Sequence, residues 1–187
     1  MELSLLLINF LAVGYVCILP FIFFKKDGTF NLLWLLTAAP YVAFELFFLA
    51  NHFGYVNSFE VPVNILPYLT AVSVIFCVLG ISIISQTIGT HSVPLALWHQ
   101  DNDAPVNIIK RGPYSKVRHP FYTSFILIMI AGCLAYPHYI SFGITLYGLI
   151  ILTLTAKKEE GKLSASKFGQ EYIDYMKVTG RFFPKVL

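Results

Sequence analysis

Long apolar stretches are the feature that most limits how this chain can fold. Five of them fill most of its 187 residues, at 3–24, 30–50, 61–88, 121–136 and 139–154. A helix needs roughly 20 apolar residues to cross the hydrocarbon core of a bilayer. Only 12% of the residues are charged, about half the share of a typical soluble domain. The pattern therefore predicts an all-α integral membrane protein with about five transmembrane helices.

All 13 lysines and arginines are expected on one side of the membrane. Two follow the first stretch, four lie between the third and the fourth, and seven follow the fifth. The other two loops, around residues 51–60 and 137–138, hold none. Cytoplasmic loops carry the excess of Lys and Arg in membrane proteins. We therefore predict a multi-pass protein with its N-terminus outside and its C-terminus in the cytoplasm, in the cell membrane of a prokaryote or the endoplasmic reticulum of a eukaryote.

The chain divides into two parts with different expected roles. Residues 1–88 should form the first three transmembrane helices, and residues 89–187 a cytoplasmic loop, a helical hairpin over 121–154 and a C-terminal helix. Near the end, Phe168, Tyr172 and Tyr175 are spaced to share one helix face. We expect an amphipathic helix on the cytoplasmic surface, and a plain interfacial anchor is the alternative. Any pocket for a water-soluble ligand should be built from these polar segments.

One candidate binding segment precedes the fourth stretch and reads KRGPYSKVRHPFY over residues 110–122. Gly112-Pro113 signals a turn, and Pro120 suits the first turn of the next helix. A helix N-terminus at the interface is a favourable place for an anionic group. Lys116 and Arg118 would alternatively serve only as anchors at the lipid headgroups. The density of Gly, Pro, Tyr, Arg and His in this short run favours a binding site.

A second candidate segment follows the fifth stretch. It begins with Glu159 and Glu160 and ends with Arg181 and Pro184. Acids are common in the first turn of a helix, which would explain the two glutamates without a site. Because they directly follow a membrane span, their carboxylates could also point into an interfacial cavity and bind a hydroxyl or amino group.

Together the two segments resemble the isoprenylcysteine carboxyl methyltransferase and phospholipid methyltransferase superfamily. The similarity lies in Gly-x-Tyr-x-x-x-Arg-His-Pro-x-Tyr before a short hairpin, followed by Glu-Glu, Phe-Gly-x-x-Tyr-x-x-Tyr and Arg-x-x-Pro. It covers roughly the last half of the chain. The resemblance implies methyl transfer from S-adenosylmethionine to an acceptor at the interface between membrane and cytoplasm.

The resemblance also implies which residues form the site. Those that would contact the cofactor are Gln100, Ile108, Ile109, Tyr114, His119, Pro120, Phe121 and Tyr122. Glu160, with Glu159 as its neighbour, would orient the acceptor or act as a base. Arg118 would bind a carboxylate or brace the C-terminal segment. The cofactor supplies the leaving group, so the protein mainly aligns the reactants.

Two differences from the family pattern bear on the acceptor. The carboxyl methyltransferases have a His at the position of Val106, and an Arg at that of Ala156 or Thr155. A guanidinium is hard to replace in binding a carboxylate. We therefore expect a lipid-like, prenylated or small apolar acceptor other than a prenylcysteine carboxylate.

Other kinds of function remain as alternatives. One is a membrane reductase of the sterol-reductase type with a nicotinamide cofactor, and another is a non-catalytic scaffold with a degenerate pocket. We expect no metal site, since His91 and His99 lack ligand spacing, and no nucleic-acid partner, since the basic residues adjoin apolar spans. Glu45 lies inside the second stretch, where an acid is a functional candidate unless it reaches the outer interface.

Overall fold

The computed structural model describes residues 3–18, 28–30, 32–90 and 108–185, without the side chains of residues 16–18, 33 and 34. The described chain forms six α-helices and a short 3-10 helix: α1 (Leu3–Ile18), α2 (Leu32–His52), α3 (Leu66–Thr90), η2 (Gly112–Ser115), α4 (Pro120–Ala135), α5 (Tyr139–Ser164) and α6 (Gly169–Val178). It contains no β-strand, and an isolated bridge joins Val117 to Gly180. The all-α prediction is confirmed for this part of the chain.

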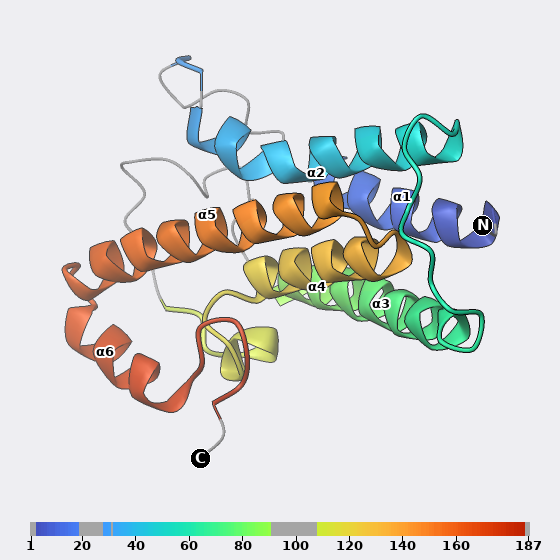
Figure 1. Cartoon of the computed structure of the whole chain (residues 1–187). Coiled ribbons are helices and arrows are strands. Elements are labelled where there is room, and N and C mark those ends of the chain that lie inside the picture. The colour runs from blue at the N-terminus through green and yellow to red at the C-terminus, as the bar shows by residue number, and fades with distance from the viewer. Residues whose placement is uncertain (1–2, 19–27, 31, 91–107, 186–187) are drawn as a thin grey trace.

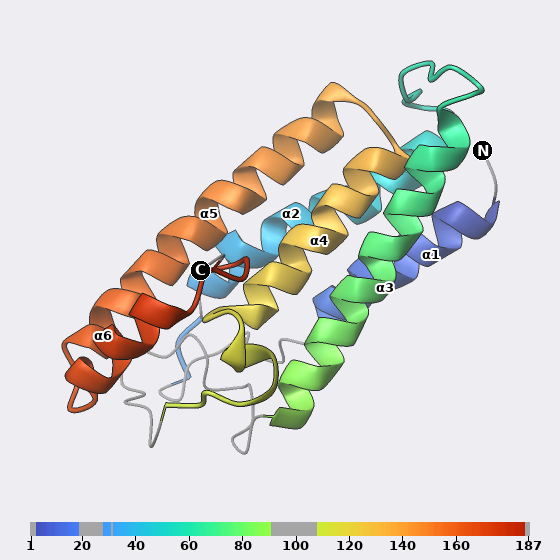
Figure 2. The ribbon, with the colours of Figure 1, turned by 90° about the horizontal axis from the view of Figure 1, so that it is seen from below.

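Helices α1 to α5 form one bundle in which consecutive helices run in opposite directions (Figure 1). The loop from α2 to α3 and the turn from α4 to α5 lie at one end of the bundle, together with the start of α1. Helices η2 and α6 and the start of α4 lie at the other end, which we call the α6 end (Figures 1 and 2). Eleven of the 13 lysines and arginines belong to the described residues, and all follow residue 108 in segments at the α6 end.

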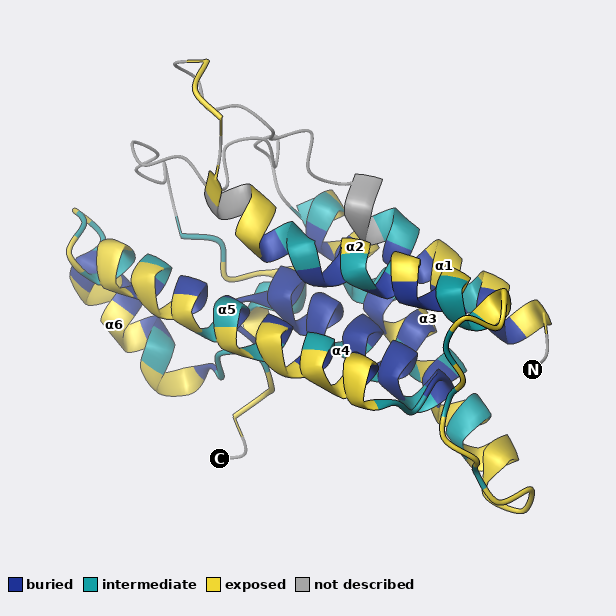
Figure 3. Cartoon of the chain, turned by 45° about the horizontal axis from the view of Figure 1, so that its top comes forward, coloured by how far each residue is buried: buried dark blue, intermediate teal, exposed yellow. Residues whose placement is uncertain are grey.

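Helix α4 is the centre of the bundle, and 13 of its 16 residues are buried (Figure 3). Close contact with α3 depends on Gly80, where a Cβ would lie 2.7 Å from the Ile128 side chain. Ser73 on α3 also donates a hydrogen bond to the Ala131 carbonyl of α4 at 2.9 Å. Helix α4, which begins within the candidate binding segment at residues 110–122, is therefore packed closely against α3.

The helices around α4 expose apolar surface. Helices α3 and α5 are both long and apolar enough to cross a membrane. Of an apolar stretch of 18 residues in each helix, only 22% in α3 and 33% in α5 is buried. Large apolar side chains point outward from each, including Ile75, Val78, Phe142, Leu146 and Ile150. Soluble proteins rarely expose contiguous apolar patches of this kind. The number of spans and their orientation stay predictions.

The turn between α4 and α5 is as tight as Pro137-His138 predicts. The His138 side chain caps α5 by accepting a hydrogen bond from the Ile140 amide at 3.1 Å. The Ser141 hydroxyl accepts one from the His138 amide at 3.1 Å, which completes a reciprocal capping box. A short, doubly capped turn keeps α4 and α5 side by side.

Helix α5 extends past Leu154, the predicted end of the fifth span, and continues to Ser164. No Gly or Pro interrupts residues 155–160, and Lys, Glu and Ala are good helix formers. Glu159 and Glu160 therefore lie in the last turns of a continuous helix and not in the first turn of a new one. This rigid extension carries both carboxylates beyond the apolar part of α5.

Glu45 does not extend to the surface at the end of α2. Both of its carboxylate oxygens are buried and have no hydrogen-bond partner among the described residues. A Cβ at Gly14 of α1 would lie 3.4 Å from one of them. The carboxyl group is thus enclosed near the α1–α2 contact, contrary to the alternative that it reaches the outer interface.

Candidate functional site

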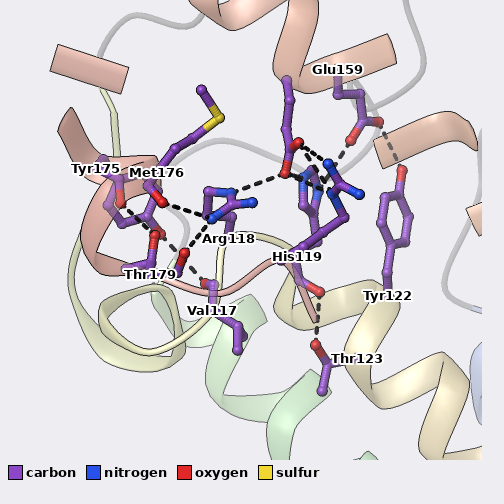
Figure 4. Close-up of polar contacts among 11 residues, drawn as sticks. Val117, Arg118, His119, Tyr122, Thr123, Glu159, Tyr175, Met176 and Thr179 are labelled. Atoms are coloured by element: carbon purple, nitrogen blue, oxygen red, sulfur yellow. Dashed lines mark hydrogen bonds and ion pairs between the residues drawn. The ribbon is translucent and has the colours of Figure 1, made fainter. Parts of the chain in front are cut away.

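The site begins at the turn that leads into α4. Gly112 has φ of 58°, a left-handed conformation that favours glycine, and it opens η2 with Pro113 next in the chain. His119 occupies the N-cap of α4 and Pro120 its first turn, as predicted. Proline fits there because the first amides of a helix have no partner within it. The backbone thus turns sharply and directs the side chains of Arg118 and His119 toward the end of α5 (Figure 4).

The chain after α6 crosses the N-terminal end of α4 and is fastened to it. The Arg118 amide donates to the Gly180 carbonyl at 2.9 Å, and the His119 amide donates to the Arg181 carbonyl at 3.1 Å. One turn further on, the Thr123 hydroxyl donates to the Phe182 carbonyl at 2.7 Å. We call residues 179–182 the tail strap. These backbone contacts bring Arg181, more than 60 residues away in sequence, beside His119.

Glu160 is the centre of a buried ion-pair cluster. Its side chain is 8% exposed and accepts hydrogen bonds from Arg118 Nε at 2.9 Å and from Arg181 Nη2 at 2.6 Å. Arg181 Nε lies 3.1 Å from both carboxylate oxygens. Arg118 also donates through Nη1 to the carbonyls of Thr179 and Met176, so it links α5, α6 and the tail strap. Glu160 is therefore occupied by partners from two segments, the turn before α4 and the tail strap.

Glu159 has different partners from Glu160, and its side chain is more exposed. It accepts a hydrogen bond from the Tyr122 hydroxyl at 2.7 Å, and its second oxygen lies 3.4 Å from His119 Nδ1 (Figure 4). Its side chain is 23% exposed. The rings of His119 and Tyr122 are stacked at 5.3 Å with 9° between their planes. Of the two carboxylates, Glu159 is the one that can still receive a ligand.

His119 lies between both glutamates. Its Nε2 is 3.3 Å from Glu160, but the approach lacks hydrogen-bond geometry. Burial disfavours the imidazolium, yet the carboxylates of Glu159 and Glu160 outweigh it, so the pKa of His119 is raised above its ordinary value. Burial also opposes ionisation of Glu160, but His119, Arg181 and Arg118 hold the pKa of its carboxyl well below the usual range. The cluster thus stabilises a charged Glu160 and favours a protonated His119.

The structure brings five of the predicted site residues together, namely Arg118, His119, Tyr122, Glu159 and Glu160. Two others are placed apart from the cluster. Pro120 begins α4, and Phe121 is buried in the bundle core, where its ring packs 6.4 Å from that of Phe125. Ile108 and Ile109 are half-buried upstream of η2. Gln100, like Val106, lies outside the described residues.

Tyr114 contributes to the site's support through its backbone. Its carbonyl accepts a hydrogen bond from the hydroxyl of Tyr175 on α6. Tyr172 and Tyr175 are both buried, so the predicted aromatic face of this helix packs on the protein. The location of α6 at the cytoplasmic surface stays a prediction. Burial raises the pKa of the Tyr114 hydroxyl, with smaller contributions from Tyr175 and Glu159.

Arg181 is the residue that sequence reasoning left out of the site. The sequence did show it, as the Arg of Arg-Phe-Phe-Pro just after the predicted C-terminal helix. What could not be read from spacing was that the strap turns back over α4. The positions where the family pattern has an Arg, Ala156 and Thr155, are buried and uncharged. Two guanidinium groups from other segments, Arg118 and Arg181, occupy the carboxylate cluster instead.

Comparison with protein-family models and with curated proteins gave no match for this chain. The chemistry of the site therefore has to be judged from its own groups. These are a guanidinium pair, an imidazole with a raised pKa, a tyrosine hydroxyl and one partly open carboxylate. Such groups can bind a polar ligand that carries both charges, and they can orient it beside apolar helices.

Proposed function

We propose that this protein is an integral membrane methyltransferase that uses S-adenosylmethionine and acts on a lipid-like or small apolar acceptor. The observation that carries the proposal is the direct contact between the two motifs. His119 and Tyr122 from the first motif meet Glu159 from the second, 37 positions after Tyr122. The resemblance to the methyltransferase superfamily was based on these same two motifs, and it implied that they form one site.

The distribution of apolar and charged residues supports the proposal of a multi-pass membrane protein. The outer faces of α3 and α5 are apolar, while every described Lys and Arg belongs to segments at the α6 end. This separation fits five spans with the α6 end in the cytoplasm. The proposed site then faces the water-soluble cofactor, and an apolar acceptor reaches it from the bilayer between helices.

Glu159 and Glu160 have different roles in the proposed reaction. S-adenosylmethionine, when bound, supplies an electrophilic methyl group together with its leaving group. The Glu159 side chain is 23% exposed and accepts a hydrogen bond from Tyr122, so it suits contact with an amino or hydroxyl group. Glu160, saturated by arginines, is better suited to position His119 and the tail strap than to accept a proton. The described residues fit the cofactor because the site offers both signs of charge beside stacked aromatic rings.

Ligand binding is the direct test. The full-length protein, purified in detergent, should bind S-adenosylmethionine in calorimetric titration and should not bind NADPH. Glu159→Gln should weaken that binding, whereas Glu171→Gln, on an exposed part of α6, should leave it unchanged. Binding of NADPH alone would favour the reductase alternative, and binding of neither would favour the scaffold.

A further inference from the structure

Two groups of the charged cluster, Arg181 and Glu159, are partly exposed. Arg181 uses Nε and Nη2 for Glu160, while Nη1 makes no hydrogen bond within the described chain and the side chain is 31% exposed. Glu159 keeps an oxygen that only approaches His119 at 3.4 Å. Between them, the side chains of Glu160 and His119 are both 8% exposed. The accessible groups are thus one guanidinium edge and one carboxylate oxygen.

These two groups belong to one continuous chain of contacts. Arg181 contacts Glu160 at 2.6 Å, Glu160 lies 3.3 Å from His119, and His119 lies 3.4 Å from Glu159. Only one carboxylate and one imidazole ring therefore separate the two groups along this chain of contacts. The carboxylate and ammonium of an α-amino acid, with a charge-assisted hydrogen bond of about 2.8 Å at each end, span roughly 8–9 Å.

The charge balance of the cluster also suits a zwitterion. The two arginines and the two glutamates balance one another, and a protonated His119 adds one positive charge. A simple anion would pair with Arg181 alone and a simple cation with Glu159 alone. A zwitterion satisfies both groups and adds no net charge to a partly buried site, where an unpaired charge is unfavourable.

We propose that Arg181 binds the carboxylate, and Glu159 the ammonium, of a zwitterionic α-amino-acid group. Under the proposed function, on which this inference rests, that group is the methionine end of S-adenosylmethionine. Arg181 thereby has two tasks: it holds Glu160 in place, and its free edge selects ligands that carry a carboxylate. The tail strap becomes part of the ligand site and not only its support.

Decarboxylated S-adenosylmethionine is the matching probe, because it keeps the ammonium and lacks the carboxylate. The wild-type protein should bind S-adenosylmethionine about 10- to 100-fold more tightly than the decarboxylated compound, the range expected for a hydrogen bond between charged groups. In Arg181→Gln this preference should fall to about 1, mainly through weaker binding of the intact cofactor. Arg181→Lys should restore part of the preference. Glu159→Gln should weaken both ligands and preserve their ratio.

Arg118→Gln is the matched control, since Arg118 also pairs with Glu160 but its side chain is only 9% exposed. It should weaken both ligands to a similar degree and leave the preference intact. Size-exclusion chromatography and thermal unfolding establish that each variant is folded. An unchanged preference in Arg181→Gln would overturn the inference while leaving the proposed function standing. Absence of S-adenosylmethionine binding in the wild type would overturn both.

Discussion

Replacement of Glu160 by Gln tests whether the buried ion-pair cluster holds the tail strap on α4. The substitution keeps the shape of the side chain and removes the charge that Arg118 and Arg181 share. Loss of one partner from a buried ion pair costs about 3–5 kcal/mol. Gln still accepts a hydrogen bond, and Arg181 is 31% exposed, so water can replace part of its pairing. We therefore expect the lower limit, about 3 kcal/mol.

For a chain of this size, about 3 kcal/mol corresponds to a fall in Tm of roughly 6–12 °C. The control is Glu171→Gln, which breaks the pair with Lys110 at 2.8 Å, where the two side chains are 44% and 47% exposed. Exposed pairs contribute about 0.2–1 kcal/mol, so its Tm should fall by at most about 4 °C. Thermal unfolding of both purified variants in the same detergent measures the difference. Equal shifts would refute the view that burial gives the Glu160 pairs their strength.

Two further predictions concern the strap and the imidazole. Gly180→Ala should loosen the strap and lower stability by about 1–3 kcal/mol, because its Cβ would lie 1.6 Å from the Phe183 carbonyl oxygen. Gly161→Ala on α5 meets nothing within 4 Å and should instead stabilise by about 0.5–1 kcal/mol; similar shifts in Tm for the two variants would contradict this reasoning. Because the pKa of His119 is raised on folding, its contribution to stability is fully present below about pH 6.5 and is lost as pH rises through the raised value. Tm should therefore decline more steeply above about pH 6.5 for the wild type than for His119→Gln, and parallel declines would exclude His119 as the cause.

The sequence predicted the helices better than it predicted their ends. Apolar stretches of suitable length located all five helices of the bundle, since hydrophobic runs dominate local structure in such chains. Beyond Leu154 the signal changed from apolar to charged residues, which marks the end of a candidate span but not the end of a helix. The backbone continued to hydrogen-bond through Lys157 and Glu160 because no residue there stops it. Hydropathy and helix length are different properties, and the sequence pattern reported only the first.

Only the part of the site that depends on local sequence features could be predicted. The turn at Gly112-Pro113 and the helix start at Pro120 are local features, so spacing alone indicated them. The cluster around Glu160 depends on long-range contacts, and no periodicity reveals that Arg181 returns to α4. Spacing also could not separate the two glutamates. Adjacent positions on a helix differ in direction by about 100°, so one carboxylate became buried among arginines while its neighbour kept an open side.

The tail strap has a consequence for the order in which the protein is made. Residues 179–182 leave the ribosome after all five bundle helices, yet they supply the second arginine of the Glu160 cluster and cover the start of α4. The helices can thus pack together while Glu160 and Arg118 still lack their last partner. The charged centre is completed only when the strap arrives. Synthesis through residue 182 therefore acts as the final step of assembly, and a chain interrupted just after α6 would contain the bundle without a finished site.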